Sequence, residues 1–281
     1  MPKCLNPRLA YQEYEGQVPR FITNRNYEEV ARNVDRLTNV KLLMLPCGKC
    51  PSCVQNKALE WTSRLVKEAE EWEYTYFLTL TYDDIHVKNL NKRDIQLFIK
   101  RFRKDTGFNL KYYVSGEYGE TTLRPHYHAI FFLNDKLSDL VFYKDNLFTS
   151  KLLKDSWKNG QVLVSNDVNE RSIKYTIGYT LKKIGESKIQ LMSKGLGLKY
   201  LENKKEDIKF SKGFYLNNGF LVNPPSYFIR KMKESSNPED IAWLEEYNYQ
   251  PSSSKKIDFT LEDLFRSMLE KQSNKKGKGV F

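Results

Sequence analysis

Continuous and alternating apolar runs in the middle of the chain predict a β-sheet. Residues 74–82, YTYFLTLTY, are rich in β-branched and aromatic side chains at odd- and even-numbered positions alike, as expected of a central strand buried on both faces. The stretches 110–117 and 124–133 predict two more strands, joined by a long hairpin with Gly119 at its turn. A further short strand is expected at 160–165, GQVLVS.

Helical periodicity surrounds these strands. Apolar residues recur every three or four positions between Ala58 and Trp72, which predicts an amphipathic helix. A second helix over 91–107 begins at an Asn cap and ends at Gly107. Further helices are expected from about Asn169 to Ile184 and near 238–248. Residues 1–46 are expected to be irregular, and residues 137–158 to be helical or irregular.

The order of these elements predicts an α+β fold with a mainly antiparallel central sheet flanked by helices. We divide the chain into four parts. These are a cysteine-containing N-terminal segment at 1–56, a core at 57–190, a C-terminal extension packing on the core at 191–250, and a basic, partly disordered tail at 251–281.

Composition points to a polyanionic partner. The 281 residues are 40% hydrophobic, enough for a sizeable core, and Lys plus Arg exceed Asp plus Glu by 46 to 35, a net charge of +11. The second helix is itself basic, and we narrowly favour phosphate contact over a merely solvated face for Lys92, Arg93, Lys100, Arg101, Arg103 and Lys104. No apolar run is long enough to span a membrane, so we expect a soluble intracellular protein with no membrane partner.

Two of the three histidines stand one residue apart in the run RPHYHAIFF. Side chains alternate along a strand, so His126 and His128 project from the same face of the predicted strand. Imidazole is the commonest metal ligand in proteins, and a pair on one face supplies two ligands of a metal site with open positions. The alternative is that two polar rings lie on the wet face of a half-exposed strand.

The helix near residue 177 carries two tyrosines on one side. Tyr175, Tyr179 and Lys182 follow at i, i+4 and i+7, opposite a predicted core stripe of Ile173, Ile177, Leu181 and Ile184. Surface tyrosines beside a lysine are the plain interpretation. Together with a metal on the histidine strand, however, such a tyrosine could attack a phosphodiester that the metal polarises.

Four cysteines form a possible second metal site. Cys47, Cys50 and Cys53 follow a C-x-x-C-x-x-C spacing, and with Cys4 they are enough to close a tetrahedral zinc site. The spacing departs from that of paired C-x-x-C zinc ribbons. The alternative is a reduced cysteine cluster at the start of a helix.

In these segments the sequence resembles the rolling-circle replication initiators of microviruses, in particular the gokushovirus type, within the HUH endonuclease superfamily. The resemblance covers most of the chain in order. It rests on CGKC with Cys53, Trp61 and Arg64, then FLTLTYDD, GEYGETTLRPHYHAIFF, YTIGYTLKK, MSKGLGLKYL and NPPSYFIRKM. The metal and tyrosine motifs in this order are specific, and the last two segments are less so.

The resemblance implies an HUH (palm- or RRM-like) fold with a role for each site residue. His126 and His128 would be metal ligands, with an acidic residue as the third. Glu117 fits if it pairs with His126 across the hairpin, because cross-strand partners share a face about 5 Å apart. Glu120, in the hairpin loop, is the competitor. Two histidines and a carboxylate suit Mg²⁺ or Mn²⁺.

The resemblance also implies a reaction and its partners. Tyr179, with Lys182 completing a YxxK core, would be the first nucleophile and Tyr175 the second. The enzyme would be a site-specific DNA endonuclease and strand transferase that nicks single-stranded origin DNA, leaving a 5′-phosphotyrosine and a free 3′-OH, and later rejoins the ends. It would act on single-stranded or supercoiled viral origin DNA in the cytoplasm of a bacterial host.

No G-x-x-x-x-G-K-[ST] motif occurs, so unwinding is expected from a host helicase, alongside a host polymerase. Two rival functions remain. One is a metal-dependent phosphohydrolase that needs no tyrosine, and the other is a basic single-stranded DNA-binding or packaging protein that needs neither motif.

Overall fold

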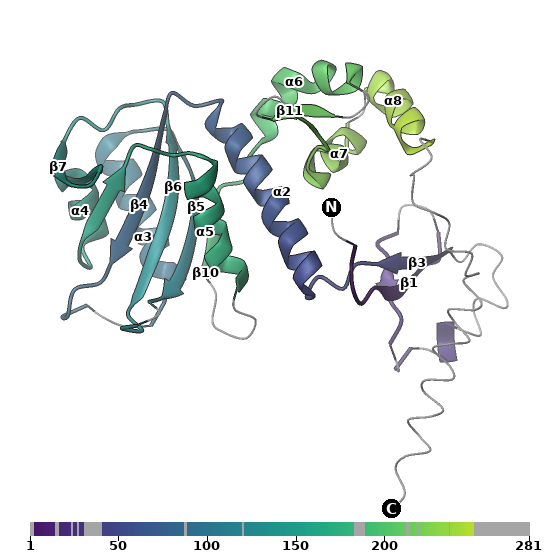
Figure 1. Cartoon of the computed structure of the whole chain (residues 1–281), viewed down its shortest axis with the longest axis horizontal. Coiled ribbons are helices and arrows are strands. Elements are labelled where there is room, and N and C mark those ends of the chain that lie inside the picture. The colour runs from purple at the N-terminus through teal and green to yellow at the C-terminus, as the bar shows by residue number, and fades with distance from the viewer. Residues whose placement is uncertain are drawn as a thin grey trace, which may run out of the picture. The chain divides into compact units, whose positions relative to one another are not determined.

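The structure is a computed structural model of the 281-residue chain. It describes residues 3–249 except 15–16, 24, 27, 31–40, 87–88, 120, 183–188, 212–213, 218–219 and 236, so the expected tail at 251–281 lies outside the described residues. The described residues divide into two compact units, a larger one of residues 54–247 and a smaller one of residues 3–53 with 248–249 (Figure 1). Each unit is described below by itself.

A seven-stranded antiparallel sheet organises the larger unit. Its order is β10 (Ile189–Met192), β5 (Leu110–Tyr118), β6 (Pro125–Leu133), β4 (Tyr74–Thr81), β9 (Val162–Ser165), β8 (Leu147–Ser150) and β7 (Leu140–Lys144). The expected α+β class is confirmed. The strand predicted to be central, β4, lies in the middle of the order.

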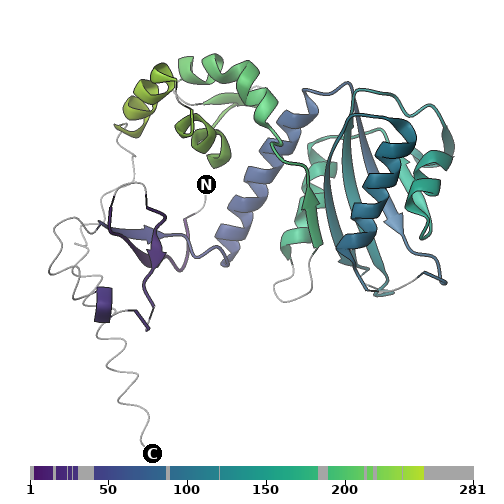
Figure 2. The ribbon, with the colours of Figure 1, turned by 180° about the vertical axis from the view of Figure 1, so that it is seen from behind.

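Helices cover both faces of this sheet. On one face α3 (Lys92–Thr106) and α4 (Lys151–Trp157) pack with the sheet around a buried aromatic core that includes Phe98, Phe131 and Trp157 (Figure 2). On the other face α2 (Pro51–Ala69) and α5 (Glu170–Lys182) contribute Leu65 and Ile177 to a second core (Figure 1). No helix in the described part of the chain is long and apolar enough to cross a membrane.

The predicted basic helix forms within a residue of its expected bounds. Asn91 caps α3 by accepting a hydrogen bond from the backbone of Arg93, and Gly107 ends it in a left-handed conformation at φ 71°. Two of its arginines are structural, since Arg101 donates to the carbonyls of Ser156 and Trp157 and Arg103 donates to that of Leu110.

Two stretches contain strands that the sequence analysis missed. The expectation for 137–158 is correct for α4 but wrong for 140–150, where β7 and β8 form a hairpin. Asp145 and Asn146 turn it with positive φ values of 45° and 61°, the conformation of a tight hairpin turn. The sequence did contain a signal for this hairpin, because runs of aromatic and β-branched residues stand on both sides of the Asp-Asn pair.

The N-terminal segment is also not irregular throughout. It contains β1 (Arg8–Gln12), β2 (Arg20–Phe21) and β3 (Lys41–Leu45), in the order β2-β1-β3. Strands of two to five residues have weak local signals. The pairing of β1 with β3 joins segments about thirty residues apart, and no local pattern reveals such a pairing.

The C-terminal part of the larger unit has its own core. It consists of α6 (Leu198–Phe210), β11 (Tyr215–Asn217), β12 (Phe220–Val222), α7 (Ser226–Lys233) and the predicted helix α8 (Pro238–Tyr249). Arg64 on α2 connects this part to the rest of the unit. Its guanidinium lies 4.1 Å from the ring of Trp61 and 3.7 Å from that of Tyr227, and it donates twice to the carbonyl of Leu196.

A buried carboxylate joins α6 to α8. Asp240 is fully buried, with Lys209 at 2.5 Å and Lys205 at 2.9 Å. Burial by itself would raise its pKa, but the hydrogen bonds from Lys209 and Lys205 outweigh this and lower the pKa to about 2. A lowered carboxyl pKa means that these pairs stabilise the fold fully above the unfolded value of about 4 and are lost as the pH falls toward 2.

We therefore expect Asp240→Asn to lower the thermal unfolding midpoint at pH 7, and this deficit to shrink at pH 3. Asp207→Asn is the matched control, because Asp207 pairs with Lys204 but is 70% exposed. It should change the midpoint little at either pH. An Asp240→Asn deficit of the same size at pH 7 and pH 3 would contradict the proposed role of the ion pairs.

Candidate metal and tyrosine site

The two histidines and one glutamate meet on one face of the sheet. In the β5–β6 hairpin Glu117 lies directly opposite His126, the register on which the choice of Glu117 depended. Ser115 lies opposite His128 in the same ladder. Because the side-chain period of a strand is two, all four side chains project to the same side.

The residue between the histidines anchors them from the opposite face. Tyr127 is fully buried, and its hydroxyl accepts from the backbone N–H of Asn91 at 2.7 Å and lies 3.1 Å from the hydroxyl of Tyr82. Tyr82 in turn donates to the buried carboxylate of Asp94. Burial raises the pKa of both tyrosines, so they remain neutral and act as fixed hydrogen-bonding groups.

The ring nitrogens nearest the chain fix the orientation of both imidazoles. Nδ1 of His126 lies 3.2 Å from the carbonyl oxygen of Arg124, and Nδ1 of His128 lies 3.3 Å from the hydroxyl of Thr79. A carbonyl oxygen only accepts, so Nδ1 of His126 is the donor. Its Nε2 then carries a lone pair in the neutral ring, as metal-binding histidines require.

Both Nε2 atoms converge on one carboxylate oxygen. The Oε1 atom of Glu117 lies 2.7 Å from Nε2 of His126 and 3.2 Å from Nε2 of His128. A lone pair and a carboxylate at such distances repel each other unless they share a cation, either a proton or a metal ion. Neighbouring ligands of an octahedral Mg²⁺ lie about 3 Å apart, so the donor set suits a small divalent cation.

Protonation of the more buried histidine is disfavoured. Burial is the largest influence on the pKa of His128 and lowers it, although hydrogen bonding to Glu117 acts in the opposite direction. The neutral imidazole is the form that binds a metal, so burial keeps the His128 ring in the form that a metal site requires near neutral pH.

The tyrosine helix packs directly against this face. The hydroxyl of Ser115 donates to the backbone carbonyl of Thr176 on α5, at 2.9 Å and in a buried position. The ring of Tyr175 stands edge-on to that of His128, with the centroids 5.3 Å apart, and the ring of Phe77 stacks on His128 at 5.5 Å and lies 6.3 Å from that of Tyr175. Tyr175 is nonetheless 47% exposed. One tyrosine of the motif therefore borders both the triad and solvent.

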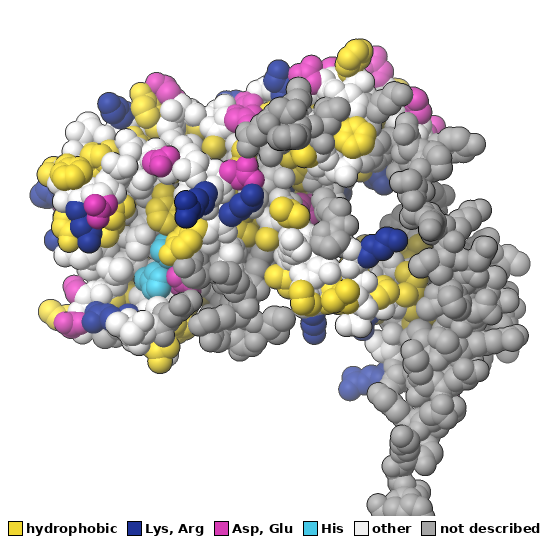
Figure 3. Space-filling model, in the orientation of Figure 1, with side chains coloured by type: hydrophobic (Ala, Val, Ile, Leu, Met, Phe, Trp, Pro, Cys, Tyr) yellow, Lys and Arg dark blue, Asp and Glu magenta, His cyan; other side chains and the backbone are white. Residues whose placement is uncertain are grey.

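Basic and acidic side chains meet at the surface around the site. On the face of the molecule seen in Figure 3, histidine side chains reach the surface beside an acidic side chain, with Lys or Arg side chains close by. The basic helix α3 is not among these neighbours, because it packs against the opposite face of the sheet. Its basic residues therefore lie away from the triad, and phosphate contact by this helix elsewhere stays a prediction.

Several predicted residues are described only in part. Tyr179 and Lys182 lie on α5, Tyr179 one turn beyond Tyr175 and Lys182 at the end of the helix, but their side chains are outside the described residues. Glu120, the competing third ligand, is also outside them. Among described residues, the triad consists of Glu117, His126 and His128.

Sequence reasoning missed the residues that support the triad. Thr79 and Phe77 lie on β4 beside His128, and Ser115 binds the tyrosine helix from β5. The sequence does indicate that Thr79 and Phe77 face the same side of the predicted strand, because they are two residues apart. It does not indicate that Thr79 lies opposite His128, because that pairing depends on which strands are neighbours in the folded sheet.

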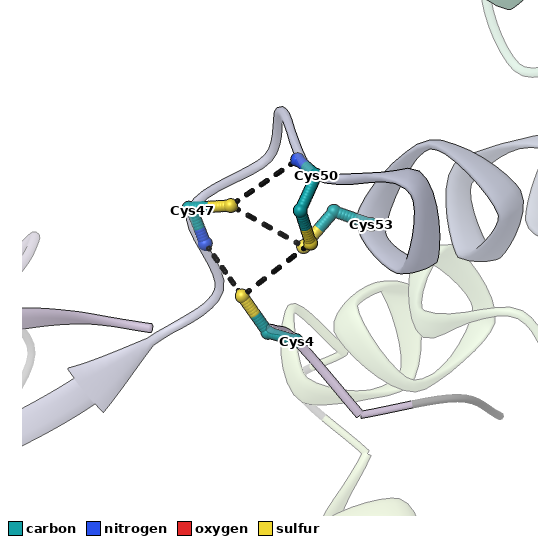
Figure 4. A group of neighbouring side chains, drawn as sticks. All are labelled: Cys4, Cys47, Cys50 and Cys53. Carbon is teal, nitrogen blue, oxygen red and sulfur yellow. Dashed lines mark hydrogen bonds between the residues drawn. The ribbon is translucent and has the colours of Figure 1, made fainter. Parts of the chain in front are cut away.

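The four cysteines also meet, within the smaller unit. Cys4 approaches Cys50, and Cys47 approaches Cys53, with all four sulfur atoms within 4.8 Å of one another (Figure 4). None is in a disulfide.

Comparison with known proteins identifies the family. The model of the family "Replication-associated protein ORF2/G2P" matches residues 75–184, which include the triad and both tyrosines. Replication-associated protein VP4 of Bdellovibrio phage phiMH2K is 33% identical over 71% of this chain and 70% of its own length. Replication-associated protein ORF2 of Spiroplasma virus 4 is 34% identical over 80% and 76%. The chain belongs to this family of phage replication-associated proteins.

A third relative extends the comparison. Replication-associated protein ORF4 of Chlamydia phage 1 is 30% identical over 67% of this chain and 54% of its own length. No solved structure matches. The resemblance inferred from the motifs is thus confirmed at the level of the family, and the replication-associated protein has a role in phage DNA replication.

Metal binding at the triad should be measurable without any activity. We expect Mn²⁺ to raise the free energy of unfolding by about 2.7 kcal/mol once free metal exceeds its dissociation constant about 100-fold. Thermal unfolding with and without Mn²⁺ measures this. Glu117→Gln should lose the shift, because a neutral amide is a poor ligand, whereas Glu206→Gln, at a 72% exposed carboxylate, should keep it. An undiminished shift in Glu117→Gln would remove Glu117 from the site.

Proposed function

We propose that this replication-associated protein starts rolling-circle replication by nicking single-stranded origin DNA through tyrosine attack, and that it later rejoins the ends. The observation that carries the proposal is the contact between Tyr175 on α5 and the ring of His128, whose Nε2 converges with that of His126 on Glu117. A nucleophile motif and a metal-ligand motif, distant in sequence, share one partly open face of the sheet.

The division of labour follows from the chemistry of each group. A Mg²⁺ or Mn²⁺ ion held by Glu117, His126 and His128 would polarise a phosphate oxygen and make the phosphorus more electrophilic. The tyrosine oxygen forms a bond to phosphorus, and the bond from phosphorus to the 3′-oxygen breaks. The phenol loses its proton, and the departing 3′-oxygen gains one. The products are a 5′-phosphotyrosine and a free 3′-OH, and the reverse reaction rejoins the strand.

The two tyrosines have separate roles in this proposal. Tyr179 is the first nucleophile, because Lys182 follows it by three residues on the same helix and its ammonium can stabilise the phenolate or the scissile phosphate. A tyrosine needs such help, since its ordinary pKa is about 10. Tyr175 then attacks the newly made junction, and alternation between the two releases a circle of unit length.

The charge and the motifs of the chain indicate which partners this reaction needs. A net charge of +11 supports sequence-independent attraction to DNA, and the sequence contains no ATP-binding P-loop motif. We therefore assign unwinding and synthesis to a host helicase and polymerase, with origin DNA as the substrate in the cytoplasm of the bacterial host.

The metal ligands should be needed for chemistry and not for DNA binding. We expect His126→Ala to lower Mn²⁺-dependent nicking of a single-stranded origin oligonucleotide by about 100-fold or more, because a metal contributes several kcal/mol to the transition state. Binding of the same oligonucleotide should change by less than about threefold, because charge dominates it. Denaturing gels and filter binding measure the two.

The third histidine provides the matched control. His86 pairs with Asp83 at 2.7 Å in an exposed loop and is not part of the triad, so His86→Ala should nick normally. Nicking that persists in EDTA would end the metal role. Cleavage with no protein–DNA adduct under any divalent metal would favour a non-covalent phosphohydrolase, and no cleavage at all would favour a DNA-binding or packaging protein.

The two tyrosines should be separable by substitution. We expect Tyr179→Phe to lose most initial cleavage, and Tyr175→Phe to form one adduct yet fail in the second transfer that closes a circle. Tyr143→Phe, at a 56% exposed tyrosine on β7, is the control and should do both. Mass spectrometry of the adduct peptide measures the site. An adduct solely on Tyr175 would reverse the assignment, and an adduct in the double Phe variant would end the tyrosine mechanism.

A further inference from the structure

The smaller unit gathers all four cysteines of the chain at one point. Cys4 precedes β1, Cys47 and Cys50 lie in the loop after β3, and Cys53 lies in the first turn of α2 (Figure 4). Cys50 and Cys53 are buried, and all four are free thiols. The proposed nicking reaction uses none of them.

Two of the sulfur–sulfur distances equal those expected for four thiolates around one ion, and all four sulfurs lie within 4.8 Å of one another. The sulfurs of Cys4 and Cys50 are 3.8 Å apart, and those of Cys47 and Cys53 are 3.9 Å apart. Four sulfurs at the usual Zn–S distance of about 2.3 Å in a tetrahedron lie about 3.8 Å from one another. A disulfide requires about 2.05 Å. A cluster of several iron atoms would hold its thiolates further apart than a single ion does.

The backbone also favours negative charge on the sulfurs. The N–H of Leu5 donates to Cys50 at 3.5 Å, that of Cys47 to Cys4 at 3.3 Å, and that of Cys50 to Cys47 at 3.3 Å. Hydrogen bonds to sulfur stabilise the thiolate, which is the form that binds a metal. Four thiolates within 4.8 Å would repel one another strongly without a cation between them.

The small size of the unit gives such an ion a structural task. Its described buried core consists of Leu9, Tyr11, Ile22 and Val30 around a three-stranded sheet. A core of this size contributes little stability, and natural domains of about fifty residues with small cores commonly depend on a metal or on disulfides. An ion bound by both Cys4 and the Cys47–Cys53 segment would link the two ends of the chain that forms this sheet.

We propose that Cys4, Cys47, Cys50 and Cys53 bind one structural Zn²⁺ ion that stabilises the N-terminal unit of the replication-associated protein. The site is chemically distinct from the Glu117–His126–His128 triad. Thiolates select soft ions such as zinc, whereas a carboxylate with two imidazoles accepts harder ions. With four protein ligands the site has no open position for a substrate, which is characteristic of structural zinc.

The test is metal analysis of the full-length protein after gel filtration in EDTA. We expect one zinc per chain, and release of that zinc when a mercurial reagent modifies the four thiols. Cys50→Ser should lose the zinc. His126→Ala should retain it while losing the Mn²⁺ effect on stability, which separates this proposal from the proposed nicking function. Ser52→Ala, between two of the cysteines, is the matched control and should keep its zinc.

Hydrogen exchange of the zinc-depleted full chain supplies a second readout that needs no variant. We expect β1 and β3 to lose protection on zinc removal, while β5 and β6 keep theirs. Less than about half an equivalent of zinc in the wild-type protein would overturn the proposal. Four sulfurs occupied by iron would overturn the choice of metal, and unchanged protection of β1 and β3 would overturn the structural role.

Discussion

Tyr127 is held inside the sheet by its hydrogen bond from Asn91 and its contact with Tyr82, and this one attachment determines where the histidines point. Because neighbours on a strand face opposite ways, a buried Tyr127 forces His126 and His128 onto the side that α5 covers. A slip of one residue would move both imidazoles into the aromatic core. The register with β5 then brings Glu117 to the same point.

The opposite sides of β6 thus perform different tasks. The side that carries Tyr127 is apolar and tightly packed, with aromatic rings from α3 and α4 around it. The other side carries polar groups that are only partly covered, since the side chains of Glu117 and His126 remain 15% and 19% exposed. Rigid packing on one side fixes the geometry of a site that stays accessible on the other.

Much of this arrangement followed from the sequence, because strong periodicity specifies local structure. The strands 74–81, 110–118 and 125–133 and the helix 92–106 formed within a residue or two of expectation. The choice of Glu117 as the third candidate ligand required only the expected pairing of Glu117 with His126 in the hairpin. What failed depended on long-range pairing, such as β1 with β3, or on a turn signal that was overlooked, as at Asp145 and Asn146. The contact of Tyr175 with His128 required the packing angle of α5, which periodicity does not provide.

The two candidate metal sites belong to different parts of the chain and differ in chemistry. The family model covers residues 75–184 and therefore includes the triad but none of the cysteines. The triad offers nitrogen and oxygen donors at a partly open surface, and the cysteine cluster offers sulfur donors that are partly or fully buried. Open hard-donor sites suit chemistry on phosphate, and closed thiolate sites suit structure.

The central claim is that strand register makes Glu117, His126 and His128 one metal centre. Anomalous diffraction from a crystal grown with Mn²⁺ tests it most directly. The account predicts a single Mn²⁺ peak within about 2.3 Å of Nε2 of both histidines and of a Glu117 carboxylate oxygen. A peak bound elsewhere, or none between these three side chains at saturating Mn²⁺, would contradict it.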